Sequence, residues 1–431
     1  MRFVDWVKNP PKGRAIVLDI DGTLVSAGER EVQSEVVTAV AGLKEGNDVF
    51  LFSNKNMPER NAALAEALGV PLLTSTAKKP FPRVLENMSS EKSVVVVGDK
   101  LLTDGLLACF VGAEFVHVAR VSGAGEPLFD AVVNTVDDTL WQAWNLFKLL
   151  RPGQWVKNVL VFAPLFFARR FLDPGLFAHA TAAFVAFCFL ASAGYCINDW
   201  RDRVGDTAHP KKRTRPIASG EVSPTLALVF AALLVSLSFL IVWTYIPAVA
   251  TVAALYFLSS LLYSIYLKRL PVLEMVFFVW FYLARVLVGG VATDVHLSAW
   301  LTLAIVFLAL FLVSAKRFAE SRSGRGRAVL AHYPPHFLEG MLVMSAALVV
   351  AFYALYTVLG LSLPGQAGAV EAFSPLAVYS TLPVLGAIIR YLQLSFQNNT
   401  DAEYPEKLLL VDPGLLLAGL AWLLMMLAVF Y

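Results

Sequence analysis

The sequence predicts a protein in two parts, a soluble α/β domain over residues 1–135 and an all-α membrane domain over residues 136–431. Three observations support this prediction. Of the 431 residues, 57% are hydrophobic and only 16% are charged, whereas charged residues approach a quarter of soluble domains. The first 135 residues nevertheless alternate short β-branched runs with helical stretches, as a soluble domain does. The remainder is a series of apolar runs, each near the ~20 residues that cross a bilayer as a helix.

The first domain contains strand-like runs at Ala15–Leu18, Val49–Phe52 and Val94–Val97, with helical stretches such as Pro58–Leu68 between them. Buried β-branched runs separated by helices predict a parallel sheet with crossover helices. The N-terminal stretch "MRFVDWVKNPPKGR" has no apolar core of the kind found in a signal peptide. We therefore expect this domain to stay in the cytoplasm.

Phosphoryl-transfer residues follow the predicted strands. In "VLDIDGTL", Asp19 and Asp21 come just after a strand, where one carboxylate can attack phosphorus and the other can protonate the leaving oxygen. Ser53, after the next strand, can hydrogen-bond a phosphoryl oxygen, and Lys79 can neutralise the transition state. In "VVVVGDKLLTDGLLA" the strand ends at Asp99, which suits Mg²⁺. Asp104 either supports that site or caps a helix.

Together these segments resemble the haloacid dehalogenase (HAD) phosphatase superfamily over residues 13–120. The resemblance implies a Rossmann-like α/β fold, catalysis by Asp19, Asp21, Ser53 and Lys79, and Mg²⁺ held by Asp19, Asp21, Asp99 and Asp104. "AKKPFPRVLE" and "GDKLLTD" are most similar to the subgroup that dephosphorylates phosphatidylglycerophosphate. The short spacers leave no room for a cap domain, so a bulky lipid head group could enter. The alternative is an inactive HAD domain kept as a scaffold or interaction module.

Nine membrane segments are predicted in the second part. They lie near residues 140–168, 176–198, 225–243, 246–264, 271–292, 299–316, 337–359, 375–392 and 412–431. Lys148, Arg151 and Lys157 interrupt the first of them, and Pro152–Gly153 should kink it.

Basic residues are concentrated in alternate loops. The loops after the second, fourth, sixth and eighth segments carry Arg201, Arg203, Lys211, Lys212, Arg213, Arg215, Lys268, Arg269, Lys316, Arg317, Arg322, Arg325, Arg327 and Lys407. The opposite loops carry only Arg169 and Arg170. By the positive-inside rule the first set faces the cytoplasm, on the same side as the phosphatase-like domain.

The loop after the second segment, "NDWRDRVGDTAHPKKRTRPIASG", combines acids and bases. Its acidic half places Asn198, Asp199, Asp202 and Asp206 on one face of a helix end. Carboxylates near the membrane are costly unless they are neutralised, and Mg²⁺ bridging to a diphosphate would neutralise them. Bases just beyond can hold the remaining phosphate oxygens, and these are Lys212, Arg213 and Arg215. The alternative is a solvated loop whose charges pair with one another.

"NDWRDRVGD" resembles the first aspartate-rich motif, NDxxDxxxD, of the UbiA superfamily of intramembrane transferases. The chain is most similar to its decaprenyl-phosphate phosphoribosyltransferase branch. The segments that carry this similarity are "RPGQWVKN", "HPKKRTRPIASG", "LYSIYLKRLPVLEM", "RVLVGGVAT" and "SAKRFAE". The resemblance implies catalysis by Asn198, Asp199, Asp202 and Asp206, with Mg²⁺ bound by these three aspartates and by Glu274, where the family usually has Asp. For Glu274 the alternative is an ion pair with Lys268 or Arg269.

Further residues in these segments are candidate substrate contacts. Besides Lys212, Arg213 and Arg215 they are Lys157, Tyr263, Lys268, Arg285, Lys316 and Arg317. Arg285 lies within an apolar segment, which suggests a cavity or a phosphate partner. For Lys316 and Arg317 the alternative is anchoring at the membrane surface by snorkelling, and Tyr263 is also compatible with an ordinary interfacial aromatic. Cys188 and Cys196 are expected to pack in the core.

The resemblances imply a bifunctional, Mg²⁺-dependent enzyme of the bacterial cytoplasmic membrane. It would transfer 5-phosphoribose from phosphoribosyl diphosphate to a polyprenyl phosphate, and its phosphatase domain would remove the 5′-phosphate. The expected partners are these two substrates and the bilayer, without nucleic acid, and the oligomeric state is left open. The alternatives are a prenyltransferase that uses a prenyl diphosphate and an aromatic acceptor, and a transporter, which would place its charges at the membrane midplane.

Overall fold

The computed structural model describes residues 2–8, 10–123, 128–208, 212–322, 330, 332–334, 336–360, 375–397, 408 and 410–431. The predicted loop residues His209, Lys211, Arg325, Arg327 and Lys407 lie outside these ranges. The chain forms two compact units, one of Met1–Lys148 with Val204–Ser223 and one of Leu149–Arg203 with Pro224–Tyr431. The predicted boundary at residue 135 therefore falls inside a helix, α5 (Leu128–Leu150).

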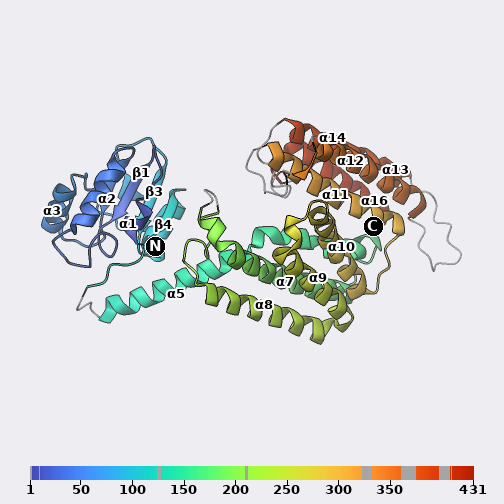
Figure 1. Ribbon diagram of the computed structural model, residues 1–431, viewed down its shortest axis with the longest axis horizontal. Coiled ribbons are helices and arrows are strands. Elements are labelled where there is room, and N and C mark those ends of the chain that lie inside the picture. The colour runs from blue at the N-terminus through green and yellow to red at the C-terminus, as the bar shows by residue number, and fades with distance from the viewer. Residues whose placement is uncertain are drawn as a thin grey trace. The chain divides into compact units, whose positions relative to one another are not determined.

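The N-terminal unit contains the predicted parallel sheet (Figure 1). Its four strands run in the order β2-β1-β3-β4, and all three pairings are parallel. Their bounds are β1 (Ala15–Asp19), β2 (Asp48–Phe52), β3 (Val94–Gly98) and β4 (Glu114–His117). The three predicted strands are confirmed. Strand β4 was not predicted, and its residues are less buried than those of the other three strands.

Helices cover both faces of the sheet, because each central strand is apolar on both sides. Ile16 and Leu18 pack on one face with residues of α2 (Ser34–Lys44) and α3 (Pro58–Leu68). Ala15 and Val17 pack on the other face with residues of η1 (Pro82–Leu85) and α4 (Leu106–Phe110). The shortest helix, α1 (Phe3–Trp6), adds Phe3 to the first of these clusters. Because all four strands are parallel, their carboxyl ends lie at the same edge of the sheet.

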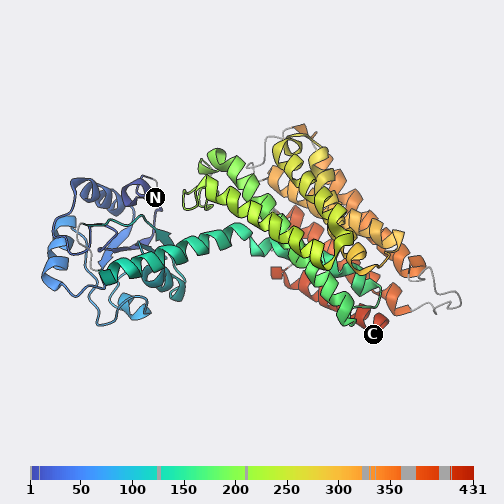
Figure 2. The same ribbon diagram turned by 90° about the horizontal axis from the view of Figure 1, so that it is seen from below.

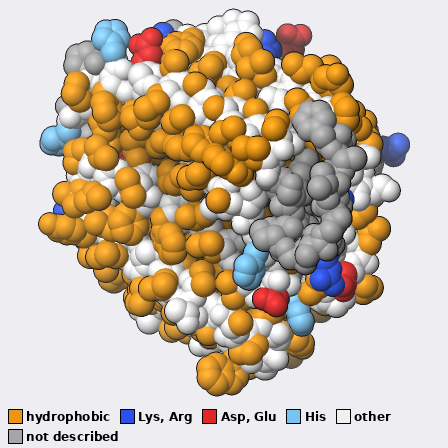
Figure 3. Space-filling model, turned by 90° about the vertical axis from the view of Figure 1, so that its right-hand side faces the viewer, with side chains coloured by type: hydrophobic (Ala, Val, Ile, Leu, Met, Phe, Trp, Pro, Cys, Tyr) orange, Lys and Arg blue, Asp and Glu red, His pale blue; other side chains and the backbone are white. Residues whose placement is uncertain are grey.

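The second unit is helical, and its long helices pack alongside one another (Figure 2). Within the described residues, eight helical segments are long and apolar enough to cross a membrane. They are Pro174–Thr207 (α7), Pro224–Tyr245 (α8), Pro247–Ile265 (η4 and α9), Leu273–Thr293 (α10), Ala299–Arg322 (α11), Phe337–Leu359 (α12 and most of η7), Pro375–Phe396 (α13 and α14) and Pro413–Phe430 (α16). Hydrophobic side chains dominate the face drawn in Figure 3, with few charged side chains among them.

The first predicted membrane segment, residues 140–168, is not one continuous helix. It consists of the end of α5, the 3₁₀ helix η3 (Pro152–Phe162) and the short α6 (Ala163–Phe167). The break lies at Arg151, whose φ of 52° is in the left-handed region, directly before Pro152. Proline disfavours helical backbone in the residue before it, so a helix that reaches this point ends there. Both η3 and α6 pack against α10 in the second unit.

Candidate active sites

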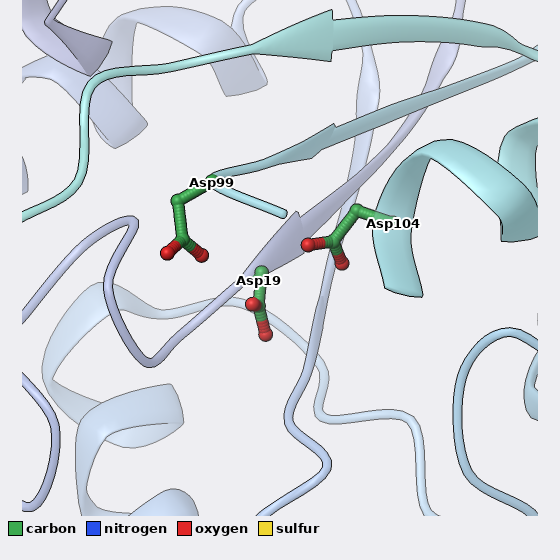
Figure 4. Close-up of side chains that lie close together, drawn as sticks. All are labelled: Asp19, Asp99 and Asp104. Atoms are coloured by element: carbon green, nitrogen blue, oxygen red, sulfur yellow. The ribbon is translucent and has the colours of Figure 1, made fainter. Parts of the chain in front are cut away.

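The first candidate site lies at the carboxyl edge of the sheet. Asp19 is the last residue of β1, Asp99 directly follows β3, and Asp104 lies within η2 (Leu101–Gly105). Each offers a carboxylate oxygen, and these oxygens lie within 4.8 Å of one another (Figure 4). All three residues are buried. Converging carboxylates are the ligands that Mg²⁺ prefers, so this donor set fits the ion.

Glycine allows the loops around these acids to close tightly. Gly22 has φ of +85°, and a Cβ there would lie 2.6 Å from Oδ2 of Asp99. At Gly98 a Cβ would lie 2.2 Å from Cγ of Asp104. Any larger residue would push the acids away from one another, so the approach of the three carboxylates depends on both glycines.

Lys79 balances the charge of this group. Its Nζ lies 2.7 Å from Oδ1 of Asp19 and also donates to Asp104. The side chain of Asn54 accepts from the backbone N–H of Lys79 at 2.7 Å and donates to its carbonyl at 3.2 Å, which fixes the position of the lysine. Burial lowers the pKa of Lys79, but the carboxylates of Asp104 and Asp19 outweigh it and raise that pKa above its usual value. The lysine is therefore charged.

Burial has the opposite effect on the pKa values of the acids. Burial raises the pKa of Asp19 well above its usual value; the charge of Lys79 opposes this rise, and Asp104 and Asp99 add to it. Burial also raises the pKa of Asp99, against a hydrogen bond from Arg120 Nε at 2.6 Å. Carboxylates that are costly to ionise in isolation gain most from a bound cation, which supports the fit of Mg²⁺ to this group.

Asp21, the predicted proton donor and a predicted metal ligand, is held separately. Its Oδ2 accepts from Ser53 Oγ at 2.6 Å, and its Oδ1 lies 2.9 Å from Arg60 Nη2. Burial raises the pKa of Asp21, but hydrogen bonds from Arg60 and Ser53 outweigh burial and hold it below the usual value. The carboxylate of Asp21 is thus directed at a serine and an arginine, and its role as a metal ligand stays a prediction.

The structure decides the alternative for Asp104. The residue lies inside η2, whose N-cap position is Lys100, so Asp104 is not a helix N-cap. Its carboxylate accepts from the backbone N–H of Lys100 at 3.3 Å and from Thr103 Oγ1 at 3.2 Å, besides its contact with Lys79. These contacts leave Asp104 buried beside Asp19 and Asp99.

Sequence reasoning missed three residues of this site: Arg60, Arg120 and Asn54. Arg60 is buried on α3 on the same face as Leu64 and Leu68, and a base in such an apolar row is a usable signal. Arg120 follows β4, the strand that was not assigned, and it pairs with both Asp99 and Asp138. Asn54 gave no signal, because its role depends on a backbone segment 25 residues away.

Arg60 is expected to position Asp21 as the proton donor. Its Nε donates to the carbonyl of Glu29 at 2.7 Å while the guanidinium holds the Asp21 carboxylate. Arg60→Lys should therefore slow hydrolysis of alkyl phosphates by about 10²-fold, a typical contribution of general acid catalysis. Hydrolysis of p-nitrophenyl phosphate, whose leaving group needs no proton, should change far less. Equal losses on both substrates would instead mean that Arg60 only maintains the fold.

The second candidate site surrounds the C-terminal end of α7, which carries the acidic motif. Asp199 is buried, and both of its carboxylate oxygens accept from Arg151 Nη2, at 2.7 and 2.6 Å. One turn further on, the two carboxylate oxygens of Asp202 lie 2.6 and 2.8 Å from Lys268 Nζ. The same lysine donates to Asn198 Oδ1 at 3.2 Å. The left-handed backbone of Arg151 and the short η5 helix (Leu267–Arg269) thus bring distant bases to the predicted motif.

The end of the same helix carries another pair. Asp206 is buried and accepts from Arg215 Nη1 at 2.7 Å, a contact within the predicted basic loop. Lys212 is half-buried and Arg213 is exposed. Part of this loop is therefore paired internally, as the solvated-loop alternative required.

Glu274 and Arg317 form a fully buried ion pair, with 2.8 Å between Oε1 of Glu274 and Nε of Arg317. Arg317 also contacts Glu320, one turn along α11. Glu274 thus pairs with a base of α11, whereas Lys268, one of the two partners considered from the sequence, binds Asp202. Arg317 is 0% exposed, so it is not an anchor that snorkels to the surface.

Breaking this pair should destabilise the second unit. Arg317→Met leaves Glu274 buried without its cation, and loss of one partner of a buried pair costs about 3–5 kcal/mol. The unfolding temperature in detergent should therefore fall strongly. The double variant Glu274→Leu with Arg317→Met should recover most of it, because apolar replacements of both partners leave no buried charge. No recovery would indicate that each residue stabilises the fold through other contacts.

The remaining predicted contacts lie elsewhere in the second unit. Arg285 is buried; its Nε donates to Asn158 Oδ1 at 2.7 Å and its Nη2 to the Tyr256 hydroxyl at 3.0 Å. Lys157 Nζ donates to Gln154 at 2.7 Å, Tyr263 packs edge-on against Phe278 and Phe281, and Lys316 is half-buried. Cys188 and Cys196 are buried, as expected of core residues.

The two sites differ in how their acids are arranged. Within the described residues, Asp19, Asp99 and Asp104 are the one group of three acidic, histidine or cysteine side chains close enough to share a metal ion. Asp199, Asp202 and Asp206 each have a basic partner instead. The first site is arranged for a cation, and the second holds acids and bases in matched pairs.

Comparisons with known proteins assign the two parts of the chain, each with one of the candidate sites, to different families. A family model described as the UbiA prenyltransferase family matches residues 159–411, and one described as mitochondrial PGP phosphatase matches residues 4–121. The decaprenyl-phosphate phosphoribosyltransferase of Mycobacterium tuberculosis (strain H37Rv) is 36% identical over 288 residues, which cover 65% of this chain and 92% of that protein. Phosphatidylglycerophosphate phosphatase 1, chloroplastic, of Chlamydomonas reinhardtii is 30% identical over 167 residues, which cover 36% of this chain and 62% of that protein.

Among solved structures, a UbiA homolog from Archaeoglobus fulgidus bound to GPP and Mg²⁺ is similar to this chain. The similarity covers 65% of this chain and 96% of that one, at 18% identity and a TM-score of 0.49. The two matching family models fall on different residues and do not overlap.

Proposed function

Because the chain belongs to the UbiA prenyltransferase family and carries an N-terminal HAD-type phosphatase domain, we propose that it is a bifunctional membrane enzyme. Its membrane domain transfers 5-phosphoribose from phosphoribosyl diphosphate to a polyprenyl phosphate, decaprenyl phosphate in the named relatives. Its phosphatase domain then removes the 5′-phosphate and leaves polyprenylphosphoryl ribose. Both sites face the cytoplasm, where the donor is made.

The observation that carries the transferase half is the 36% identity to phosphoribosyltransferases across 92% of their length. The paired charges on α7 support it. A diphosphate chelated to Mg²⁺ presents both a cation and anionic oxygens. Asp199 and Asp202 can therefore exchange their basic partners for the metal, while Arg151 and Lys268 exchange these carboxylates for phosphate oxygens. No charge is left unpaired by this exchange, which keeps the cost of opening buried pairs low.

The transfer needs little acid–base help from the protein. An anionic oxygen of the lipid phosphate attacks C1 of the ribose, the C1–O bond to the diphosphate breaks, and the diphosphate leaves with the bonding electrons. Arg151 and Lys268 would hold that developing charge, and Asn198 and Asp199 would keep the donor in line with the lipid. Because the acceptor is already an anion, no general base is required.

The phosphatase half is supported by the gathering of Asp19, Asp21, Ser53, Lys79, Asp99 and Asp104 at one sheet edge. Asp19 would attack the 5′-phosphorus, and the P–O5′ bond would break. O5′ would take a proton from Asp21, which must therefore be protonated in the substrate complex although its pKa without substrate lies below the usual value. Water then hydrolyses the aspartyl phosphate. Mg²⁺ held by Asp19, Asp99 and Asp104 would draw charge from the phosphoryl oxygens, as it would from the departing diphosphate at the second site.

A doubly labelled donor tests both halves at once. Purified protein is incubated with Mg²⁺, polyprenyl phosphate and phosphoribosyl diphosphate that carries ¹⁴C in the ribose and ³²P in the 5-phosphate. We expect ¹⁴C in the lipid fraction and ³²P in inorganic phosphate, with neither product formed when EDTA removes the metal. Lipid that retains both labels would contradict the phosphatase half.

A parallel reaction with a prenyl diphosphate and an aromatic acceptor addresses the alternative. We expect no prenylated product from it. Prenylation, together with no ¹⁴C in the lipid of the first reaction, would replace the proposed transfer by prenyl transfer.

A further inference from the structure

Helix α5, the long turquoise helix of Figure 1, carries an unusual row of exposed apolar side chains. Its members recur at intervals of about one turn, and the most exposed is Leu128 at 82%. They are Leu128, Phe129, Val132, Val136, Leu140, Trp144 and Phe147. We name these seven residues the α5 stripe. Such a continuous row on one face of a helix marks a surface that is normally covered.

The opposite face of α5 is bound to the phosphatase domain. The carboxylate of Asp137 accepts from the backbone N–H groups of Leu101 and Leu102, at 2.8 Å each. Asp138 pairs with Arg120, which also holds Asp99. Trp141 is buried, with its ring 4.2 Å from that of His117 on β4. These contacts fix the rotation of the helix, so the α5 stripe points away from the phosphatase domain.

The sequence of α5 also indicates what covers the stripe. The helix ends at Leu150, and Leu149 already belongs to the unit that contains the eight apolar helices. Trp144 and Phe147, whose rings stack at 5.7 Å, lie within two turns of that end. Two turns of helix span only about 11 Å, so these rings stay within that distance of the first residues of the membrane unit. Tryptophan near a membrane boundary is typical of the head-group region.

We propose that α5 lies in the plane of the membrane interface, with the α5 stripe in the boundary between lipid head groups and acyl chains. A spanning orientation is excluded by Asp137 and Asp138, because the phosphatase domain bound to them cannot enter the bilayer. An in-plane helix needs a row of large apolar and aromatic residues on one face, and α5 has that row. The apolar content of residues 140–150 thus belongs to an interfacial helix.

This orientation has a consequence for the phosphatase, one that rests on the proposed function. The bonds from Asp137 to the start of η2 join α5 to the segment that carries Asp104. A helix held in the interface therefore keeps the carboxyl edge of the sheet close to lipid head groups. A lipid-bound ribose phosphate would reach Asp19 without leaving the bilayer.

Spin labels on the full chain in vesicles of phosphatidylglycerol and phosphatidylethanolamine test the proposal. Cys109 is the exposed cysteine and is replaced by serine, while the buried Cys188 and Cys196 stay. Labels are attached at Val136→Cys, at Leu140→Cys and, as the water reference, at Glu66→Cys on α3. Collisions with oxygen, which concentrates in lipid, are compared with collisions with a water-soluble nickel complex.

At Val136 and Leu140 we expect oxygen collisions to exceed nickel collisions severalfold relative to Glu66, at a depth of about 5–10 Å. Nickel accessibility equal to that at Glu66 would overturn the proposal, because the stripe would then face water. Protection from both reagents would also overturn it, since protein would then cover the stripe. Broadening of the spectra would identify that protein as a second copy of the chain.

A functional arm separates this proposal from the proposed function. Val136→Glu with Leu140→Glu should lower hydrolysis of the lipid phosphate in vesicles about tenfold, since two charged groups replace apolar ones that the proposal places in lipid. Hydrolysis of p-nitrophenyl phosphate should stay unchanged, and Thr135→Glu, which adds one carboxylate at an exposed polar position of α5, should change neither activity. If the protein hydrolyses no phosphate at all, the proposed function fails while the spin labels still decide where α5 lies.

Discussion

Asp19→Asn is expected to abolish dephosphorylation while transfer continues, so that polyprenylphosphoryl ribose 5-phosphate accumulates. The substitution keeps the shape of the side chain and removes the oxygen that would attack phosphorus. The rate of phosphate release should fall by at least about a thousandfold, as when the nucleophile is removed from other hydrolases. Mass spectrometry of the lipid product, which is heavier by one phosphate in the variant, measures the result.

The fold should tolerate Asp19→Asn. Burial raises the pKa of Asp19, so its ionised form is costly, and the amide removes that cost while Lys79 keeps Asp104 as a partner. Asp48→Asn is the matched control, because Asp48 starts β2 at the opposite edge of the sheet and binds Lys92 and Ser90. It should accumulate no phosphorylated lipid. If Asp19→Asn gives the wild-type product, the phosphatase domain does not act on the lipid.

Asp202→Asn is expected to reduce transfer by about 10²–10³-fold, the usual loss when one preorganised electrostatic group is removed from an active site. The carboxylate is one of the two that would hold the donor complex, and its loss also frees Lys268 from its charged partner. Incorporation of ¹⁴C-ribose into lipid measures transfer. Phosphatase activity on p-nitrophenyl phosphate should be unchanged, which separates the two sites.

The matched control for Asp202→Asn is Asp173→Asn at the other end of α7. Asp173 accepts from the backbone N–H groups of Gly175 and Leu176, and asparagine caps a helix start as well as aspartate does. This variant should transfer ribose normally. A loss equal to that of Asp202→Asn would mean that transfer responds to any change of charge on α7, and the acidic motif would lose its assigned role.

Local pattern was enough to predict much of this molecule. Three of the four strands, the order of the phosphatase residues and eight of the nine membrane segments follow from runs of residue types, which depend on neighbours in sequence. In the segment at 140–168 the predicted break at Pro152–Gly153 is present, at Arg151. The prediction did not separate α5 from η3 and α6, because total apolar content was read without regard to the face of the helix. Stripe residues and buried residues of α5 lie within the same helical turns, as Leu140 and Trp141 do, so the total apolar content of a segment does not distinguish them.

Pairings across the chain could not be predicted in the same way. Lys268 reaches Asp202 over 66 residues, and Arg151 reaches Asp199 over 48. The sequence suggested a local base for Glu274, whereas its partner lies on α11. Helix packing decides which base pairs with which acid, and the identity of a single residue does not reveal its partner. The roles of Arg60 and Arg120 depend on such packing as well.

The two proposed activities lie on one polypeptide chain, because α5 runs from the first unit into the second without a break. A phosphatase on the same chain meets the product of the transferase at a higher effective concentration than a separate protein would. Each transferase molecule is also accompanied by one phosphatase, whatever the expression level. The phosphorylated lipid should therefore remain a transient species, too short-lived to spread through the membrane and meet competing enzymes.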